Sequence, residues 1–316
     1  TWSIFKIEIK ESILAKDGLF NWSLSSLNDP YAVCCLAFAF TMVFAGKLQD
    51  AVSPRFTATI GGILTGAGLI LISFSNAWFS WILGFGVLTG MGIGFAYASA
   101  TPPAIKWFPS AKTGMIAGIV VSGFGLASVY VAPLAMFLIS QFGISKAMLI
   151  FGIAFLVVVF TLAQFLVNPP KDLVHPGEGQ SGSSEAYLPN EYSPRKMLRT
   201  AAFYKLWIIY CVAAGAGLMI ISGVAGIAKQ GMGEMAWIVV ALMAVGNASG
   251  RVIAGILSDR IGRANTLFIM MVFQSIVIFS LLFIAPEQVI LLVIAASLIG
   301  FNYGTNLSLF PSATKD

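Results

Sequence analysis

Arg251 lies deeper inside an apolar stretch than any other charged residue of this sequence. The other basic and acidic residues, from totals of 18 and 13, fall between the long apolar runs or near their ends. A buried guanidinium is costly unless it faces a cavity, a partner or an anion. Its planar fork of donors suits a carboxylate, which it binds through two parallel hydrogen bonds. The alternative is structural, because Asp259 follows about 12 Å further along a helix and a long side chain pointing that way reaches water.

Neutral donors of the right kind accompany Arg251. Asn247 lies one helical turn before it on the same face. Tyr97 and Tyr303 are expected within about one turn of Arg251 in depth, counted along their own helices. Phenol and amide groups at this depth can bind carboxylate oxygens, and the alternative is an ordinary hydrogen bond between helices. The complete set of candidate substrate contacts is Arg251, Tyr303, Tyr97, Asn247, Asn302, Asn306 and Tyr130.

Long apolar helices must position these side chains. Hydrophobic residues make up 58% of the 316 residues and charged residues 10%, far from the roughly 25% charged residues of soluble domains. A helix that crosses a bilayer needs about 20 mostly apolar residues. Nine stretches qualify, at 30–46, 57–75, 78–101, 114–139, 145–167, 202–227, 235–257, 265–285 and 288–310. The first is expected to begin with Asp29 as its N-cap and Pro30 as its first helical residue.

The placement of Lys and Arg orients these helices. One set of loops carries Lys47, Arg55, Lys106, Lys112, Lys171, Arg195, Lys196, Arg199, Arg260, Arg263 and Lys315, and the opposite set of short loops carries Lys146 and Lys229. The richer set is therefore expected in the cytoplasm of a protein of the cell membrane. The first residues, Thr-Trp-Ser-Ile-Phe, are expected to be the end of a first helix, and residues 3–28 are expected outside. The Pro-, Gly- and Ser-rich segment 168–200 is expected to be a cytoplasmic loop between an N-terminal half, 1–167, and a C-terminal half, 201–316.

Several classes of function are disfavoured by the same residues. The single histidine, His175, lies in the polar segment, and Cys34, Cys35 and Cys211 lie in apolar runs without metal spacing. No metal, cofactor or catalytic cluster is therefore expected, which argues against a membrane enzyme. The glycines of 84–94 lack a preceding strand, so they predict close helix packing, as do Gly62-x-x-x-Gly66 and Gly114-x-x-x-Gly118. The basic residues follow topology, so nucleic acid is not expected, and neither is an obligatory protein partner or a sensor role.

A short motif occurs twice. Gly46-Lys-Leu-Gln-Asp50 is followed by Arg55, and Gly255-Ile-Leu-Ser-Asp259 is followed by Arg263. Both copies lie between two predicted spans on the cytoplasmic side, as expected for two duplicated halves. The aspartates can accept hydrogen bonds from neighbouring helix N-termini, and the arginines can pair with carboxylates or helix ends, which suggests a gate. The alternative is that these charges only mark the cytoplasmic side.

These residues together resemble the major facilitator superfamily, and within it the oxalate/formate antiporter family. Besides the repeated motif, the resemblance rests on Trp22-Ser-Leu, Pro102-Pro-Ala-Ile-Lys-Trp-Phe-Pro109, the glycine-rich run 114–125, Phe203-Tyr-Lys-Leu-Trp207, Gly250-Arg251 and the run 302–311. It covers essentially the whole chain. It implies an all-α fold of two pseudo-symmetric six-helix halves, with the first, eleventh and twelfth helices outside these 316 residues.

The resemblance also implies a function. It implies that a dicarboxylate is held between an arginine of the eighth helix, here Arg251, and a lysine of the eleventh helix, with aromatic side chains around it. The expected activity is alternating-access exchange of small carboxylates such as oxalate and formate. The alternative is a proton-coupled carrier for a monocarboxylate such as lactate, pyruvate or formate. No Asp, Glu or His lies within the predicted spans to carry a proton, which favours exchange.

Overall fold

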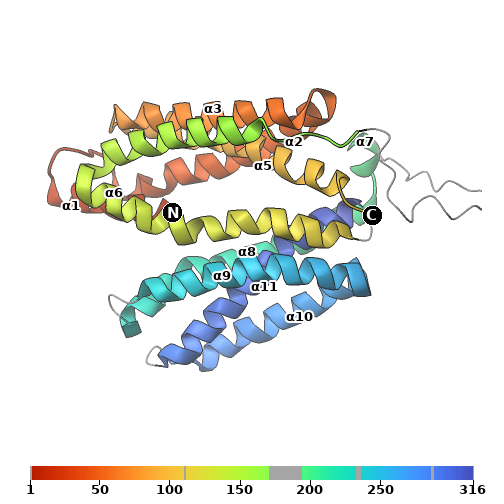
Figure 1. Ribbon diagram of the computed structural model, residues 1–316. Coiled ribbons are helices and arrows are strands. Elements are labelled where there is room, and N and C mark those ends of the chain that lie inside the picture. The colour runs from red at the N-terminus through yellow and green to blue at the C-terminus, as the bar shows by residue number, and fades with distance from the viewer. Residues whose placement is uncertain (1, 110–111, 171–193, 233–235, 286–287, 316) are drawn as a thin grey trace, which may run out of the picture. The chain divides into compact units, whose positions relative to one another are not determined.

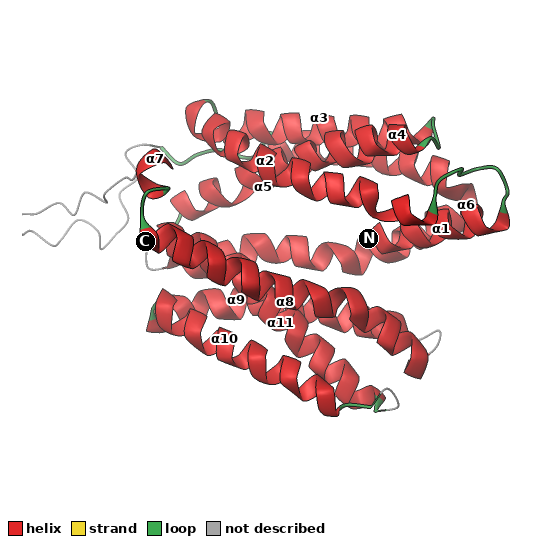
Figure 2. Ribbon diagram, turned by 180° about the vertical axis from the view of Figure 1, so that it is seen from behind, coloured by secondary structure: helices red, strands yellow, loops and turns green. Residues whose placement is uncertain are grey.

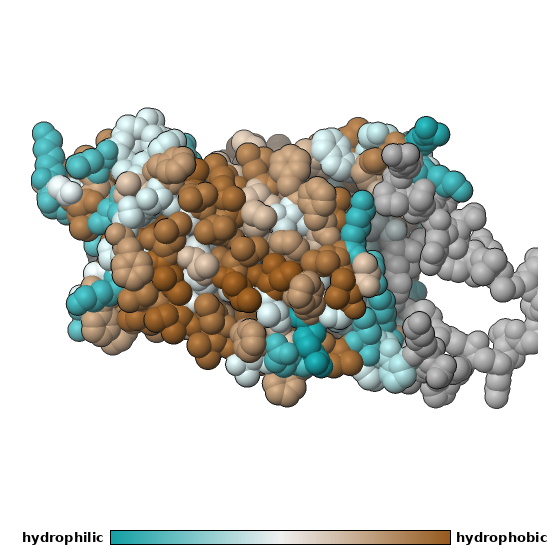
Figure 3. Space-filling view, turned by 90° about the horizontal axis from the view of Figure 1, so that it is seen from above, coloured by the Kyte–Doolittle hydropathy of each residue, from teal (hydrophilic) through white to brown (hydrophobic). Residues whose placement is uncertain are grey.

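Helices are the regular elements of this chain throughout its described residues, as a computed structural model shows (Figure 2). The structure describes residues 2–109, 112–170, 194–232, 236–285 and 288–315. A helix satisfies its backbone N–H and C=O groups internally, which a chain in hydrocarbon requires. On the face seen in Figure 3, hydrophobic side chains dominate the middle and many hydrophilic ones lie nearer the edges.

The helices follow one another along the chain as Figure 1 colours them from red to blue. Those of the N-terminal part are α1 (Trp2–Ala15), η1 (Leu24–Asn28), α2 (Asp29–Ala51), α3 (Pro54–Ser73), α4 (Trp78–Trp81), η2 (Ile82–Thr89), α5 (Gly90–Lys106) and α6 (Thr113–Ala163). The remainder are α7 (Pro194–Met197), α8 (Ala201–Met232), α9 (Ala236–Ile261), α10 (Arg263–Ser280), η5 (Leu281–Phe283) and α11 (Val289–Lys315).

Helix lengths confirm the predicted spans. Within the described residues, eight continuous helical segments are long and apolar enough to cross a membrane. The longest, α6, has 51 residues but is interrupted at Gly143, where φ is 78° and ψ is 167°. Only glycine adopts such a conformation readily, so α6 is two helices joined at this residue. Counted in this way, the described segments match all nine predicted spans.

The chain divides into two compact units, each described by itself. Unit 1 comprises residues 1–107 and 130–171, and unit 2 comprises residues 108–129 and 172–316. The predicted halves, 1–167 and 201–316, follow the sequence repeat rather than packing and remain a prediction. Most of the predicted cytoplasmic loop, residues 171–193 with His175, lies outside the described residues.

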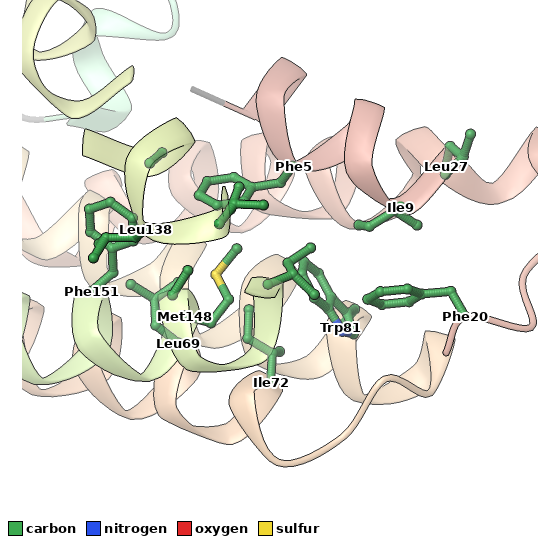
Figure 4. Close-up of a cluster of buried hydrophobic side chains, with 14 of the residues drawn as sticks. Phe5, Ile9, Phe20, Leu27, Leu69, Ile72, Trp81, Leu138, Met148 and Phe151 are labelled. Atoms are coloured by element: carbon green, nitrogen blue, oxygen red, sulfur yellow. The ribbon is translucent and has the colours of Figure 1, made fainter. Parts of the chain in front are cut away.

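Unit 1 is held by an apolar cluster and by close backbone contacts. In Figure 4, Phe5 and Ile9 of α1 lie among side chains of α3 and α6, and Trp81 packs beside Phe20. The second part of α6 meets α3 at glycines, since a Cβ at Gly66 would lie 2.8 Å from Leu156 Cβ. The predicted small-residue surfaces of α3 and of residues 84–94 therefore do bring backbones together.

Only the end of a first helix was expected at the N-terminus, whereas α1 continues to Ala15. Its 14 residues are too few to cross a bilayer, yet Phe5 and Ile9 are buried in the unit 1 core. Beyond its end, the Asp17 carboxylate accepts hydrogen bonds from Ser12 Oγ at 2.6 Å and from the Leu19 N–H at 2.8 Å. These bonds stabilise the ionised form and lower the pKa of Asp17.

Two local details of unit 1 differ from expectation. The N-cap of α2 is Asn28 rather than Asp29, which is instead the first helical residue and accepts a hydrogen bond from Trp78 Nε1 at 3.2 Å. The predicted span at 78–101 contains an eight-residue π-helix, η2, in which Thr89 Oγ1 donates to the Gly84 carbonyl at 3.0 Å. Such wide turns have no simple periodicity signal, so sequence reasoning missed this one.

Candidate functional site

Arg251 is buried within unit 2, with 1% of its surface exposed. Its Nε donates a hydrogen bond to Asn247 Oδ1 at 2.9 Å, and its Nη1 donates to the main-chain carbonyl of Val121 on α6. The guanidinium carbon also lies 5.6 Å from the centre of the Phe124 ring, within cation–π range. The acceptors in these two hydrogen bonds are neutral, so neither of them cancels the positive charge.

The Arg251 side chain points toward the beginning of α9. Asn247 precedes Arg251 by one turn, whereas Asp259 follows it by two turns. Side chains on a helix lean toward its N-terminus, which favours this direction. The structure therefore places the guanidinium away from Asp259 and from the predicted cytoplasmic surface.

Glycines bring the first part of α6 very close to α9 around Arg251. A Cβ atom at Gly118 would collide with the carbonyl oxygen of Arg251, and one at Gly125 would lie 3.1 Å from Asn247 Oδ1. Val121 lies between these two glycines along α6. The lack of side chains on this stripe lets the Val121 carbonyl reach the guanidinium, so the packing of α6 on α9 shapes the site.

Tyr303 lies on α11, beside the same stretch of α9. A Cβ atom at Gly304 would collide with the carbonyl oxygen of Asn247, so the two helices touch through their backbones here. The half-buried ring of Tyr303 packs over Gly217 of α8, where a Cβ would lie 2.9 Å from Tyr303 Cδ2. Unit 2 thus places Arg251, Asn247 and Tyr303 on neighbouring segments of α9 and α11.

The side chains of Asn302 and Asn306 on α11 contact helix α10. Both are fully buried: Asn302 Nδ2 donates to the Met270 carbonyl of α10 at 2.7 Å, and Asn306 Nδ2 lies 3.4 Å from Gln274 Oε1. Gln274 in turn donates to the Ala213 carbonyl of α8 at 2.9 Å. These contacts are hydrogen bonds between helices, the alternative already considered for these two amides.

Tyr97 and Tyr130 belong to unit 1 and are described apart from Arg251. The half-buried Tyr97 ring meets Phe38 edge-on, with centroids 5.8 Å apart. Tyr130 is 65% exposed. Their predicted contact with a substrate stays a prediction.

The second copy of the repeated motif forms a compact ionic cluster. Asp259 accepts hydrogen bonds from the main-chain N–H groups of Gly114 at 3.0 Å and Met115 at 2.8 Å, at the beginning of α6. Arg263 Nη1 lies 2.6 Å from Asp259 Oδ1 and also donates to Ser258 Oγ. A carboxylate at a helix N-terminus is favoured by the unpaired N–H groups and the helix dipole. Asp259 therefore ties α9 to the start of α6.

The first copy of the motif has a different environment in the described residues. Asp50 lies 3.7 Å from Lys106 Nζ, and the two side chains are 71% and 48% exposed. Arg55 is exposed, and a Cβ atom at Gly46 would meet nothing within 4 Å. Gly255, by contrast, packs directly against Gly114. The two copies are alike in sequence but not in packing.

Comparison with known proteins identifies the family. The sequence profile of the Major Facilitator Superfamily matches residues 1–316. The chain belongs to the Major Facilitator Superfamily. It is therefore a membrane transporter with several spans, and the predicted fold class is confirmed.

Curated relatives of this chain are also transporters by name. This chain is 28% identical over 321 residues to the uncharacterized MFS-type transporter YhjX of Escherichia coli, with 100% of this chain and 75% of that protein aligned. It is 22% identical over 321 residues to the oxalate:formate antiporter of Oxalobacter formigenes, covering 100% of this chain and 72% of that protein. Monocarboxylate transporter 12 of Xenopus laevis is 38% identical over 150 residues, 48% of this chain and 31% of that protein.

A solved superfamily structure shares the fold. The crystal structure of the transporter FucP in its outward conformation superposes with a TM-score of 0.62 over 98% of this chain and 85% of that one, at 14% identity. At this identity the likeness extends to the fold alone.

Sequence reasoning missed two neighbours of Arg251 in this superfamily member. Val121 contributes a main-chain carbonyl, which has no side-chain signal, and no sequence pattern paired Phe124 with Arg251. The glycine spacing of α6 was the available signal for both, because it predicted a close helix partner without naming it.

Proposed function

We propose that this transporter exchanges small carboxylates by alternating access and that Arg251 binds the substrate carboxylate. The observation that carries the proposal is the buried Arg251 guanidinium, which is held in place by hydrogen bonds to Asn247 Oδ1 and to the Val121 carbonyl. A carboxylate offers a full negative charge in a medium of low dielectric constant, where its attraction to the guanidinium is strong. The names of two relatives, an oxalate:formate antiporter and a monocarboxylate transporter, agree with an anionic substrate of this class.

Neighbouring side chains receive roles from their positions. Asn247 holds Nε and so fixes the direction in which the guanidinium presents its other donors. Tyr303 supplies a phenol from α11, and we propose that Tyr97 and Tyr130 of the predicted N-terminal half also contact the substrate. Asn302 and Asn306 are assigned to helix packing instead, because their amide groups donate to α10.

We further propose that the repeated motif works as a cytoplasmic gate. The predicted halves place the start of α6 in one half and Asp259 in the other, so the Asp259 bonds to Gly114 and Met115 would join the halves. Breaking a charged cap and its Arg263 ion pair would accompany the opening of the transporter to the cytoplasm. The predicted cytoplasmic position of the loop 168–200 belongs to the same proposal.

Exchange is tested with purified protein in vesicles. Uptake of labelled oxalate or formate is measured with and without unlabelled carboxylate inside, and with and without an inward proton gradient. We expect uptake to require the internal carboxylate and to ignore the proton gradient. Uptake that follows the proton gradient and ignores preloading would contradict exchange.

Proton-coupled monocarboxylate transport is the second candidate, favoured by the 38% identity to monocarboxylate transporter 12 over 150 residues. Lactate and pyruvate are therefore included in the same assay. Proton-driven uptake of either one, without preloading, would establish this candidate in place of exchange.

A further inference from the structure

The Val121 carbonyl uses one of the Arg251 donors that would be available to a substrate carboxylate. It accepts a hydrogen bond from Nη1, one of the two terminal nitrogens that form the carboxylate-binding fork. Phe124, one turn along α6, covers the guanidinium from the same helix. Because 1% of Arg251 is exposed, an anion reaches it only when a covering segment moves, and the Val121 carbonyl and the Phe124 ring belong to that cover.

We propose that the Arg251–Val121 bond is a lock that holds the empty transporter in one orientation. The inference rests on the proposed function, in which Arg251 binds the carboxylate and α6 and α9 belong to different halves. Asp259 ties the start of α6 to α9, and Arg251 ties Val121 of α6 to α9 two turns further along. The structure thus holds α6 to α9 at these two points.

Substrate binding removes one of these two points. A carboxylate is a stronger acceptor for a guanidinium than a peptide carbonyl, because it carries a full charge in a site from which water is excluded. Once the carboxylate takes the guanidinium, the Val121 carbonyl is released and the Asp259 cap is the one of these two points that still ties α6 to α9, so separating the two helices costs less. The loaded carrier then reorients and the empty carrier does not, which is the physical condition for exchange.

The close glycine contacts between α6 and α9 allow a single substitution to weaken the proposed lock. A methyl group on residue 118 would collide with the carbonyl oxygen of Arg251 and push α6 away from α9, whereas one on residue 123 would meet nothing within 4 Å. Gly118→Ala therefore weakens the lock without touching the guanidinium. Gly123→Ala is the matched control on the same helix, with the same change in composition.

The test is release of labelled oxalate from vesicles into medium with no external carboxylate. Gly118→Ala should raise this release about tenfold, the change expected when one hydrogen bond to a charged group is lost, while exchange continues. Gly123→Ala should release no more than the unmodified protein. A folded Gly118→Ala protein that exchanges normally and does not leak would overturn the lock.

A second variant covers the case in which Gly118→Ala does not fold. Phe124→Leu keeps an apolar side chain of similar reach but removes the ring over the guanidinium, and should raise release about threefold. Unchanged release in folded Phe124→Leu would then reject the proposal. Failure of the proposed function is distinct, because it appears as normal carboxylate binding in Arg251→Gln.

Discussion

A guanidinium inside a membrane protein needs acceptors for its hydrogen bonds, and the surroundings of Arg251 supply them from two helices. Asn247 is on its own helix and Val121 on α6. Snorkelling toward Asp259 would have used neither, and helix geometry favours the direction observed. The residue type and depth of Arg251 could be read from the sequence. Its acceptor on α6 could not, because a main-chain carbonyl carries no residue identity.

Asn302 distinguishes packing from substrate contact at the scale of single residues. Its amide donates to the Met270 carbonyl, so Asn302→Ala should lower stability by about 0.5–1.5 kcal/mol, the range for hydrogen bonds between membrane helices. Carboxylate affinity should change by less than about twofold, because a residue that only packs helices makes no contact with the substrate. Loss of a substrate contact worth about 1.4 kcal/mol would instead weaken binding about tenfold. Thermal unfolding and carboxylate titration measure the two quantities. A tenfold loss of affinity in Asn302→Ala would instead show that Asn302 contacts the substrate.

Tyr303→Phe is the companion variant, and it should reduce carboxylate affinity.

Helices of this chain meet through glycine, and the spacing of the glycines predicted the spans that approach closely. Gly62-x-x-x-Gly66 meets the second part of α6, and Gly114-x-x-x-Gly118 meets α9. Which helix would be the partner could not be predicted, because spacing on one helix does not identify the other. The π-helix η2 and the length of helix α1 were missed for a related reason, since both depend on neighbours in unit 1.

The α9–α11 contact predicts a strong effect of one methyl group. A Cβ atom at Gly250 would collide with the carbonyl oxygen of Phe301, whereas one at Gly215 would meet nothing within 4 Å. Gly250→Ala should therefore destabilise the protein by about 1–3 kcal/mol, as overpacking does. Gly215→Ala should be neutral or stabilise slightly, because alanine favours the helix. Midpoints of thermal unfolding in detergent compare the two, and equal midpoints would contradict this packing.

The two copies of the repeated motif should respond differently to loss of charge in this chain. Asp259→Asn weakens two bonds to the start of α6 and the pair with Arg263, at an expected cost of about 1–3 kcal/mol. Asp50→Asn affects an exposed contact to Lys106 and should cost less than about 1 kcal/mol. Unfolding of the 316-residue protein measures both. A larger loss of stability in Asp50→Asn than in Asp259→Asn would show that the packing difference between the two copies does not set their contributions to stability.

The whole chain is expected to cross the membrane with its basic loops in the cytoplasm. Described helices fix where the spans are, but side assignment rests on Lys and Arg alone. Ser25 is exposed in the segment expected outside, and Ser183 lies in the central loop, beyond the described residues. In a protein whose native cysteines are replaced, Ser25→Cys should react with an impermeant maleimide in intact cells. Ser183→Cys should react only after the cells are opened, and the reverse pattern would invert the topology.

Carboxylate binding by Arg251 is the central claim, and a titration of purified protein with oxalate and formate tests it most directly. Arg251→Gln should raise Kd about 30-fold or more, because a buried charge pair is worth at least about 2 kcal/mol. Arg260→Gln removes the same charge from an exposed position of α9 and should leave Kd within about twofold. An Arg251→Gln protein that binds either carboxylate as tightly as the unmodified protein would contradict the account.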